Sequence, residues 1–490
     1  MPGKYAVPQE IRAMKPKGTM VKKIPGGYYV YEYKSVRDES GKRKTKMGAC
    51  IGKIDPALGF VPNSNALGDE EVTCLDFGEW AVAEANSRGT WGLLLEHFNP
   101  SDAERIYVAA LVHFVQGFTY MRDLARFLEM SVLSLRHPGL RMGYDAMGGL
   151  YEDLGRRQGP VLAFEQALVD RSSGLVAIDG HVVGAGSREN CLAAKGYKFA
   201  KLGEPQMNLL MAFDAKTNAP LLSRMYEGAA LDRSDVADLL AQARFEGVIF
   251  VVDRGFYSEE NVGLLTGRGN HYVVPLSKGL KACRQAVSSL EMQGRFVWQR
   301  GSKATVVEYK EDEIGGRRVL TYRDLSESAA MQANYLRRMG RGDRAYTQER
   351  FDELAPLMGV TVLQTSLPAG DRDAESVYGL YKQRWSVETY FDYFKNGQDA
   401  HSLCQQDFHK VQGLSFVMLV SGLIHREVAD AVAASGLGMS VGNVLMDARM
   451  VKAAKRNGVW VAVNCKKKRV AAFEALNTTL EVVPSLGWPT

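Results

Sequence analysis

The sequence has few cysteines, and those it has are scattered. Six cysteines lie far apart without a CxxC pair, which excludes the usual zinc-site spacing and a disulfide framework. The longest apolar run, residues 411–424, is too short to span a bilayer and predicts a buried core helix. The first 18 residues lack the apolar core of a signal peptide. These absences favour a cytoplasmic protein with no membrane partner.

The composition is that of a globular protein, but its charge is unevenly distributed. The 490 residues are 46% hydrophobic and 24% charged, which predicts two to four domains in a soluble chain. Residues 1–50 hold 12 Lys or Arg against four Asp or Glu, a charge of +8 (12 − 4). Because the whole chain carries +5, the remainder sums to −3 (5 − 8). The basic start indicates a phosphate-binding surface, although a solvated charged hairpin explains it equally well.

Two different patterns occupy the first 170 residues. Residues 28–53 alternate as a β-hairpin does. Residues 101–130 repeat apolar side chains at helical spacing, and Ser101 followed by Glu104 predicts a capping box at their start. We therefore expect an all-α segment over residues 75–170.

From residue 171 onward, short apolar runs predict strands between helices. The order of these elements predicts a mixed α/β fold in which helices cover one sheet. A further group of β-like pieces between residues 293 and 366 predicts a β-rich insertion. Long helices are expected at residues 374–395 and 410–434. The strands of the sheet are expected at residues 173–180, 206–214, 219–228, 247–253 and 271–277.

Two aspartates are distinguished by their position in these strands. Asp179 and Asp253 are each expected at the end of a buried strand. A carboxylate there costs desolvation energy unless it has a partner. Ligands of α/β sheets gather at strand ends, so the two aspartates could converge on a divalent cation. Taken singly, each is more often a turn or cap residue.

The helix near residue 388 carries an unusual polar stripe. At 100° per residue, its four members fall within about 60° of one another. A solvated salt-bridge face explains part of the stripe, because Arg384 and Glu388 are spaced as an i, i+4 pair. The four residues are Tyr381, Arg384, Glu388 and Lys395.

The stripe and the two aspartates together indicate metal-dependent phosphate chemistry. Asp179, Asp253 and Glu388 could hold two Mg²⁺ ions, or Mn²⁺, about 3.5–4 Å apart. One ion would activate water or a DNA 3′-hydroxyl, and the other would stabilise the leaving oxygen. The basic groups and phenol of the stripe would then bind phosphates beside the cut.

The spacing Tyr381-x2-Arg384-x3-Glu388-x6-Lys395 resembles a known signature. It is the tyrosine–arginine–glutamate–lysine signature of bacterial insertion-sequence transposases. These DDE enzymes have an RNase H-like catalytic domain with a β-rich insertion, so the resemblance implies that fold.

Two further motifs extend the resemblance to about residue 435. "VAIDG" at Asp179 and "VVDRGFYS" at Asp253 resemble the first and second aspartate motifs of the family. The 135 residues from Asp253 to Glu388 (388 − 253) leave room for the family's insertion. The hairpin at residues 28–53 resembles the one that opens a subgroup of these proteins. One departure is His181, close after the first aspartate, where members often carry a hydroxyl residue; we interpret it as a structural histidine.

The resemblance implies roles for six residues and a set of partners. The metal-binding catalytic triad would be Asp179, Asp253 and Glu388, and the DNA contacts near the cleaved end would be Tyr381, Arg384 and Lys395. The implied partner is double-stranded DNA, both element ends and target, bound by a homodimer associated with the nucleoid. Two alternatives stay open: a metal-dependent endonuclease without strand transfer, and a non-catalytic DNA-binding descendant.

These patterns together divide the chain into six expected segments. They are a basic N-terminal hairpin region (1–70), a helical DNA-binding segment (71–170), the first part of the catalytic domain (171–280), a β-rich insertion (281–370), the second catalytic part (371–440) and a C-terminal segment (441–490).

Overall fold

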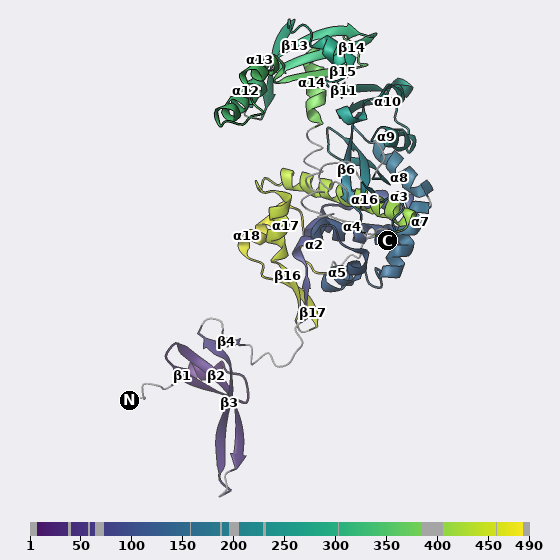
Figure 1. Ribbon diagram of the computed structural model, residues 1–490. Helices are drawn as coiled ribbons and strands as arrows, with labels where there is room; N and C mark the ends of the chain where they lie inside the picture. Colours follow the sequence, from purple (N-terminus) through teal and green to yellow (C-terminus); the bar gives the residue numbers. More distant parts are fainter. Residues whose placement is uncertain are drawn as a thin grey trace. The chain divides into compact units, whose positions relative to one another are not determined.

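The chain forms two compact units in the computed structural model (Figure 1). One unit comprises residues up to Cys74 with Lys455–Val459, and the other comprises Leu75–Ala454 with Trp460–Thr490. The division into six segments stays a prediction. The structure describes residues 7–37, 41–56, 59–63, 73–156, 158–186, 189–195, 205–228, 232–301, 303–384, 405–456 and 458–483.

The first unit is a small antiparallel sheet with one short helix, α1 (Gln9–Ala13). Its strands follow chain order as β1-β2-β3-β4, and the predicted hairpin forms its centre. A small core of Ile11, Val30, Ile51 and Ile54 closes one face. The strands are β1 (Thr19–Ile24), β2 (Gly27–Arg37), β3 (Arg43–Asp55) and β4 (Gly59–Pro62).

In the second unit a helical segment follows the short strand β5 (Cys74–Asp76). The longest helix of this segment, α4 (Pro100–Gln116), does not start with the predicted Ser101–Glu104 capping box. Asn99 is the cap: its side chain accepts the Asp102 N–H at 3.0 Å, and Pro100 occupies the first helical position, where no N–H is needed. The other helices of the segment are α2 (Gly78–Ala85), α3 (Arg88–His97), α5 (Leu124–Met130), α6 (Leu133–Arg136), α7 (Tyr144–Arg156) and α8 (Gln158–Asp170).

The predicted strands form the centre of a large mixed sheet, which confirms the mixed α/β class. Its central part runs in the order β9-β8-β6-β10-β11. The first three strands are antiparallel, whereas β10 runs parallel to both β6 and β11. The helix predicted near residue 234 is α9 (Asp232–Ala241). The strands are β6 (Leu175–Gly184), β8 (Pro205–Asp214), β9 (Pro220–Glu227), β10 (Ile249–Val252) and β11 (His271–Pro275).

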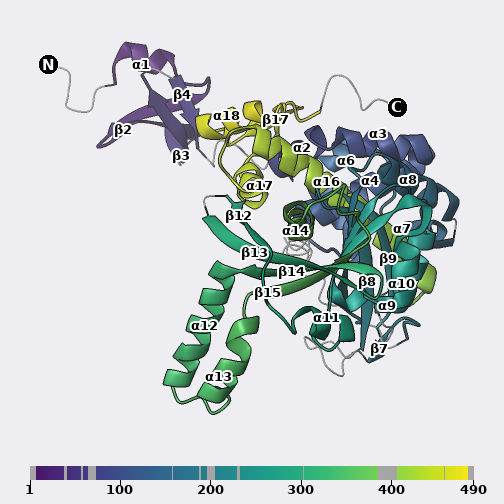
Figure 2. The ribbon, with the colours of Figure 1, turned by 90° about the horizontal axis from the view of Figure 1, so that it is seen from above.

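The β-rich insertion extends this sheet instead of forming a separate one. Strand β15 (Val360–Thr365) pairs antiparallel with β11, and the sheet continues through β14, β13 and β12. Helices α12 (Leu325–Gly340) and α13 (Gln348–Leu354) project from it as a pair (Figure 2). The remaining insertion strands are β12 (Gly294–Arg300), β13 (Lys303–Ile314) and β14 (Arg317–Asp324).

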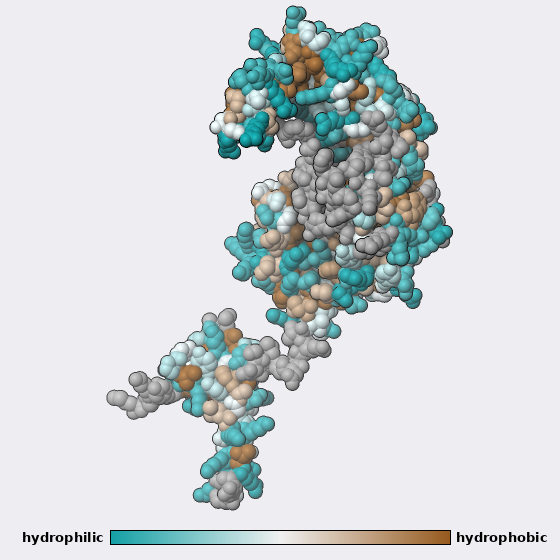
Figure 3. Space-filling model, in the orientation of Figure 1, coloured by the Kyte–Doolittle hydropathy of each residue, from teal (hydrophilic) through white to brown (hydrophobic). Residues whose placement is uncertain are grey.

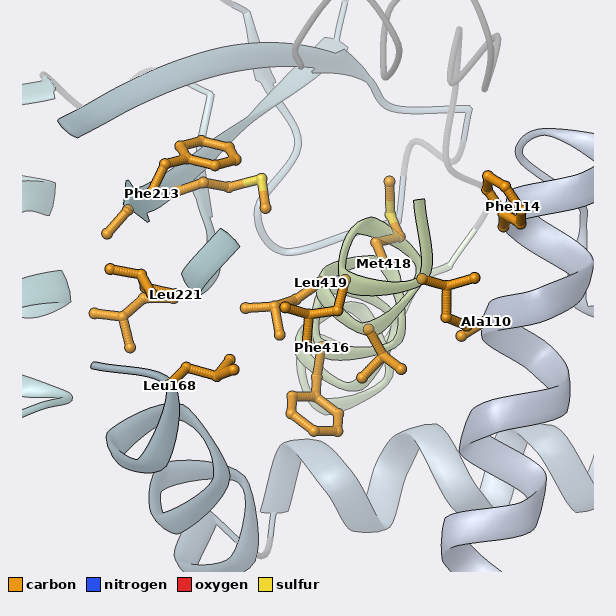
Figure 4. Close-up of a cluster of buried hydrophobic side chains, with 14 of the residues drawn as sticks. Ala110, Phe114, Leu168, Phe213, Leu221, Phe416, Met418 and Leu419 are labelled. Atoms are coloured by element: carbon orange, nitrogen blue, oxygen red, sulfur yellow. The ribbon is translucent and has the colours of Figure 1, made fainter. Parts of the chain in front are cut away.

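Helix α16 (Phe408–Ala434) runs through the core of the second unit. The apolar run at 411–424 is buried within it almost without interruption, which confirms the predicted core helix. Figure 4 shows Phe416 and Leu419 of this helix among side chains from α4, α8 and the β8–β9 strands. In the described part of the chain, no helix is long and apolar enough to cross a membrane. The chain then continues through α17 (Val441–Arg449), β16 (Lys452–Arg456), β17 (Val459–Val463) and α18 (Lys467–Ala475).

Candidate active site

Two aspartates occupy equivalent positions on neighbouring parallel strands. Val252, the last residue of β10, pairs with Ile178 of β6, and the next residues are Asp253 and Asp179. The backbone of Asp253 remains extended, with φ −78° and ψ 161°, so it continues the line of its strand. Adjacent strands lie about 4.8 Å apart, and equivalent residues face the same side of the sheet. The fold therefore places the two carboxylates side by side.

The two aspartates differ in one respect from the prediction that both end a strand. Asp253 does follow the end of β10, but Asp179 lies in the middle of β6. Strand β6 continues because β8 pairs along its other edge as far as Gly184. Both carboxylates are half-buried, and each accepts the N–H of the following residue, Gly180 or Arg254, at 2.8 Å.

Two more predicted residues, Tyr381 and Arg384, lie near Asp253. Tyr381 lies in α14 (Ala374–Gln383), and Arg384 directly follows it with 7% of its surface exposed. Burial raises the pKa of the Tyr381 hydroxyl above its usual value. The Arg384 side chain, hydrogen-bonded to that hydroxyl, lowers the pKa, and the charge of Asp253 raises it again. Arg384 and Asp253 thus both act electrostatically on the Tyr381 hydroxyl.

The insertion strands hold α14 in this position. The Tyr378 ring packs on Tyr322, Trp298 and Phe296, with centroid separations of 5.0, 5.5 and 5.6 Å. The Tyr322 hydroxyl also donates a 2.7 Å hydrogen bond to the carbonyl oxygen of Ala374 in the first turn of α14. The insertion therefore supports the helix that presents Tyr381 to Asp253.

A cavity of about 420 Å³ adjoins Asp253 and Tyr381. Three basic side chains line it: Arg254, Lys278 and Arg284. None of the three is among the site residues that the sequence predicts. All three follow the carboxyl ends of β10 and β11, and that position is the signal that could have identified them. Their positive charge suits the cavity to an anionic group such as phosphate.

Two predicted site residues, Glu388 and Lys395, lie outside the described residues. Within the described ranges, no group of three or more His, Cys, Asp or Glu could hold a metal ion. The pair that is described, Asp179 and Asp253, supplies the hard oxygen ligands that Mg²⁺ and similar cations take. His181 is half-buried two residues after Asp179, on the same face of the strand. The described residues therefore bring together two carboxylates of the kind that bind divalent cations, and the metal-binding role of Asp179, Asp253 and Glu388 stays a prediction.

A protein-family model described as "Transposase DDE domain" matches residues 170–421. This span includes both aspartates, the insertion and α14, and it covers just over half of the chain. The chain belongs to the DDE transposase family. It is therefore a DDE-type transposase, an enzyme of DNA recombination whose family uses divalent metal ions, as the motifs predicted.

One solved structure gives a distant likeness to this transposase. It is a piggyBac transposase synaptic complex with hairpin DNA, at 12% sequence identity and a TM-score of 0.38. The alignment covers 75% of this chain and 77% of that chain. No curated protein sequence matches this chain.

Proposed function

We propose that this transposase cuts the ends of an insertion sequence and joins the freed 3′-hydroxyls to target DNA by two-metal phosphoryl transfer. The parallel register of Val252 with Ile178, which sets Asp253 beside Asp179, carries the proposal. The sheet order supports an RNase H-like core: an antiparallel meander, β9-β8-β6, is followed by parallel strands β10 and β11.

In this proposal three carboxylates divide the work of holding metal. Asp179 and Asp253 provide oxygen ligands from the sheet, and Glu388, which follows α14 in the sequence, provides the third. Two Mg²⁺ ions, when bound, would supply an activated nucleophile and stabilise the charge on the leaving oxygen. The amide hydrogen bonds of Gly180 and Arg254 orient the two aspartates toward that role.

The polar stripe and the basic cavity hold the DNA phosphate. Because the pKa of Tyr381 is raised, its hydroxyl stays protonated at neutral pH and can donate a hydrogen bond to a phosphate oxygen. Arg384 sets the direction of that hydroxyl through their hydrogen bond. Lys395 adds a further contact, and the basic side chains of the cavity attract the strand beside the cut.

The reaction also implies an assembly. A transposase that cuts and joins both ends of an element needs two active sites on one DNA complex. We therefore propose a homodimer on double-stranded DNA, acting at the nucleoid.

A plasmid carrying the DNA that flanks this gene provides the test. Purified protein and Mg²⁺ are incubated with it, and nicks and joined products are mapped on gels. The variants are Asp253→Asn and Glu388→Gln. Glu259→Gln is the matched control, since Glu259 is an exposed acid near Asp253 in the chain and pairs with Arg317.

Each outcome has a distinct meaning. Cuts at the gene's borders with joined products, abolished in both site variants and kept in the control, support the proposal. Cuts without joined products would favour the endonuclease alternative. Binding without any cuts by the wild-type protein would identify a non-catalytic descendant and overturn the proposal.

A further inference from the structure

The β2–β3 hairpin extends beyond the small core of the first unit as a two-stranded ribbon (Figure 1). We define the basic ribbon as residues 32–37 and 43–47, all of which are exposed. The register slips between Tyr31 and Tyr33, where a β-bulge gives the partner strand an extra residue. Because bulges bend and twist a strand pair, the ribbon forms an element distinct from the rest of the sheet. Its five cross-strand residue pairs make it about 17 Å long.

The positive charge of the ribbon is high enough to destabilise the pairing of its own two strands. It carries five basic residues against Glu32 alone. Lys34 lies directly opposite Lys46, and Arg37 lies directly opposite Arg43. Like charges opposite each other on neighbouring strands destabilise the pair. A polyanionic partner would relieve this repulsion.

The two faces of the ribbon carry different chemistry, because successive side chains alternate between them. One face, the lysine face, holds Lys34, Val36, Lys44 and Lys46. The other, the mixed face, holds cross-strand pairs of arginine, hydroxyl and apolar residues. These pairs are Arg37 with Arg43, Ser35 with Thr45, and Tyr33 with Met47.

Exposed apolar side chains add a second observation. Tyr33 and Met47 are 42% and 44% exposed although they lie opposite each other at the base of the ribbon. In Figure 3 the ribbon's surface is mainly hydrophilic with hydrophobic residues set among the hydrophilic ones. A partner that offers both phosphates and apolar base edges fits this mixture better than an acidic protein surface does.

We propose that the basic ribbon enters the major groove of duplex DNA, with the mixed face toward the base edges and the lysines reaching the phosphates. The proposal rests on the proposed function, since it takes DNA as the substrate. A two-stranded ribbon fits a groove about 12 Å wide. Arginine pairs with guanine edges, hydroxyls bond either base, and apolar atoms contact thymine methyl groups. The ribbon would thereby select the DNA that the catalytic unit cuts.

The first experiment measures phosphate contacts in the full-length protein. Binding to a labelled duplex from the gene's border is followed over a range of salt concentrations. Lys34→Gln/Lys46→Gln should lower the slope of log affinity against log salt by about 2, one for each lost contact. Lys22→Gln/Lys23→Gln removes two exposed charges from strand β1 of the same unit, and should leave the slope within about 0.5 of wild type.

The second experiment measures base readout with the border duplex and a scrambled duplex of equal composition. Arg37→Gln/Arg43→Gln should reduce the preference for the border duplex by about 10-fold or more, whereas the lysine variant should weaken both duplexes equally. Equal salt slopes for both lysine variants, or an unchanged preference in the arginine variant, would overturn the proposal.

Cleavage separates this proposal from the transposase reaction itself. At protein concentrations that saturate the border duplex, the ribbon variants should cut at the wild-type rate. Border binding that depends on the ribbon without cleavage would overturn the proposed function and leave the ribbon's role standing. If the protein cleaves at the border but its binding does not depend on the ribbon, the ribbon's role is overturned and the proposed function stands.

Discussion

The backbone of Gly413 in α16 lies directly against that of Tyr151 in α7. A Cβ added at Gly413 would be 2.0 Å from the Tyr151 carbonyl oxygen, closer than real Cβ contacts allow. The same relation recurs one turn along: a Cβ on Gly155 would be 2.0 Å from the His409 carbonyl oxygen. Two glycines, one on each helix, thus set how closely the core helix approaches the helical segment.

Substitution of Gly413 by alanine should therefore destabilise the second unit. Because backbone atoms must move, we expect Gly413→Ala to lower the free energy of unfolding by about 1–3 kcal/mol. Gly149→Ala is the matched control: Gly149 also lies in α7, but nothing is within 4 Å of its added Cβ. The control should be neutral or stabilising by up to about 1 kcal/mol. Urea unfolding of the full chain measures both, and equal values would contradict the close approach.

A buried ion pair joins α8 to strand β9. Both terminal nitrogens of Arg224 donate to the Glu165 carboxylate at 2.7 Å, and Glu165 is fully buried. Glu165→Gln should lower the free energy of unfolding by about 3–5 kcal/mol, because it leaves the arginine without its counter-charge. Glu96→Gln removes the partner of Arg171 in an exposed pair and should cost at most about 1 kcal/mol. Denaturant midpoints within error of each other would refute this difference.

A histidine in the helical segment makes stability depend on pH. His137 bonds Glu84 through Nε2 at 3.2 Å and Glu104 through Nδ1 at 2.8 Å, while Arg136 also pairs with Glu84. Burial lowers the pKa of His137, but the two carboxylates outweigh it and raise the pKa to about 9. The imidazole is therefore charged in the folded protein at neutral pH.

The sign of the pH effect follows from this raised pKa. The stabilisation is fully present below the unfolded value of 6.5 and is lost as pH rises through about 9. The rise of the pKa from 6.5 to about 9 corresponds to about 3 kcal/mol. His137→Gln should flatten the fall in stability between pH 6.5 and 9.5, measured by denaturant unfolding. His113→Asn should leave it unchanged, because burial already lowers the pKa of His113 to about 4; equal pH profiles in wild type and His137→Gln would refute the assignment.

The strands could be predicted from the sequence because their apolar runs are clear. The sequence could not show which of the aspartates at the strand ends belong to the active site. Asp214 ends a predicted strand just as Asp253 does. Its carboxylate nevertheless accepts hydrogen bonds from Ser173, Lys216 and Thr217, which lower its pKa although burial acts to raise it. Asp214 therefore closes a turn. Asp253 instead follows a strand that pairs in parallel with β6, which sets it next to Asp179.

Strand pairing was the other limit of sequence reasoning. The alternation over residues 293–366 predicts a β-rich insertion but not the partners of its strands. The pairing of Val273 with Thr365 joins the insertion to the central sheet. That pairing spans 92 residues (365 − 273), a distance at which local periodicity carries no information.

Two tyrosines one turn apart in α14 allow the proposed site to be tested without changing charge. Tyr381 faces Asp253 and Arg384, whereas Tyr378 is buried in the aromatic cluster of the insertion. The Tyr378 hydroxyl donates a long hydrogen bond, 3.4 Å, to the Asp324 carboxylate. Removing the Tyr381 hydroxyl should therefore affect a bound phosphate, and removing the Tyr378 hydroxyl should not.

Tyr381→Phe is expected to slow cleavage by about 10- to 100-fold, because one directed hydrogen bond to the reacting phosphate contributes about 1.4–2.7 kcal/mol. Its free energy of unfolding should stay within about 1 kcal/mol of wild type, since the ring that packs is unchanged. Tyr378→Phe should cleave at the wild-type rate. Single-turnover cleavage of a border duplex at saturating protein measures both variants. Equal rates for the two would place the Tyr381 hydroxyl outside the reaction, whereas a loss confined to Tyr381→Phe would place it at the phosphate beside Asp253.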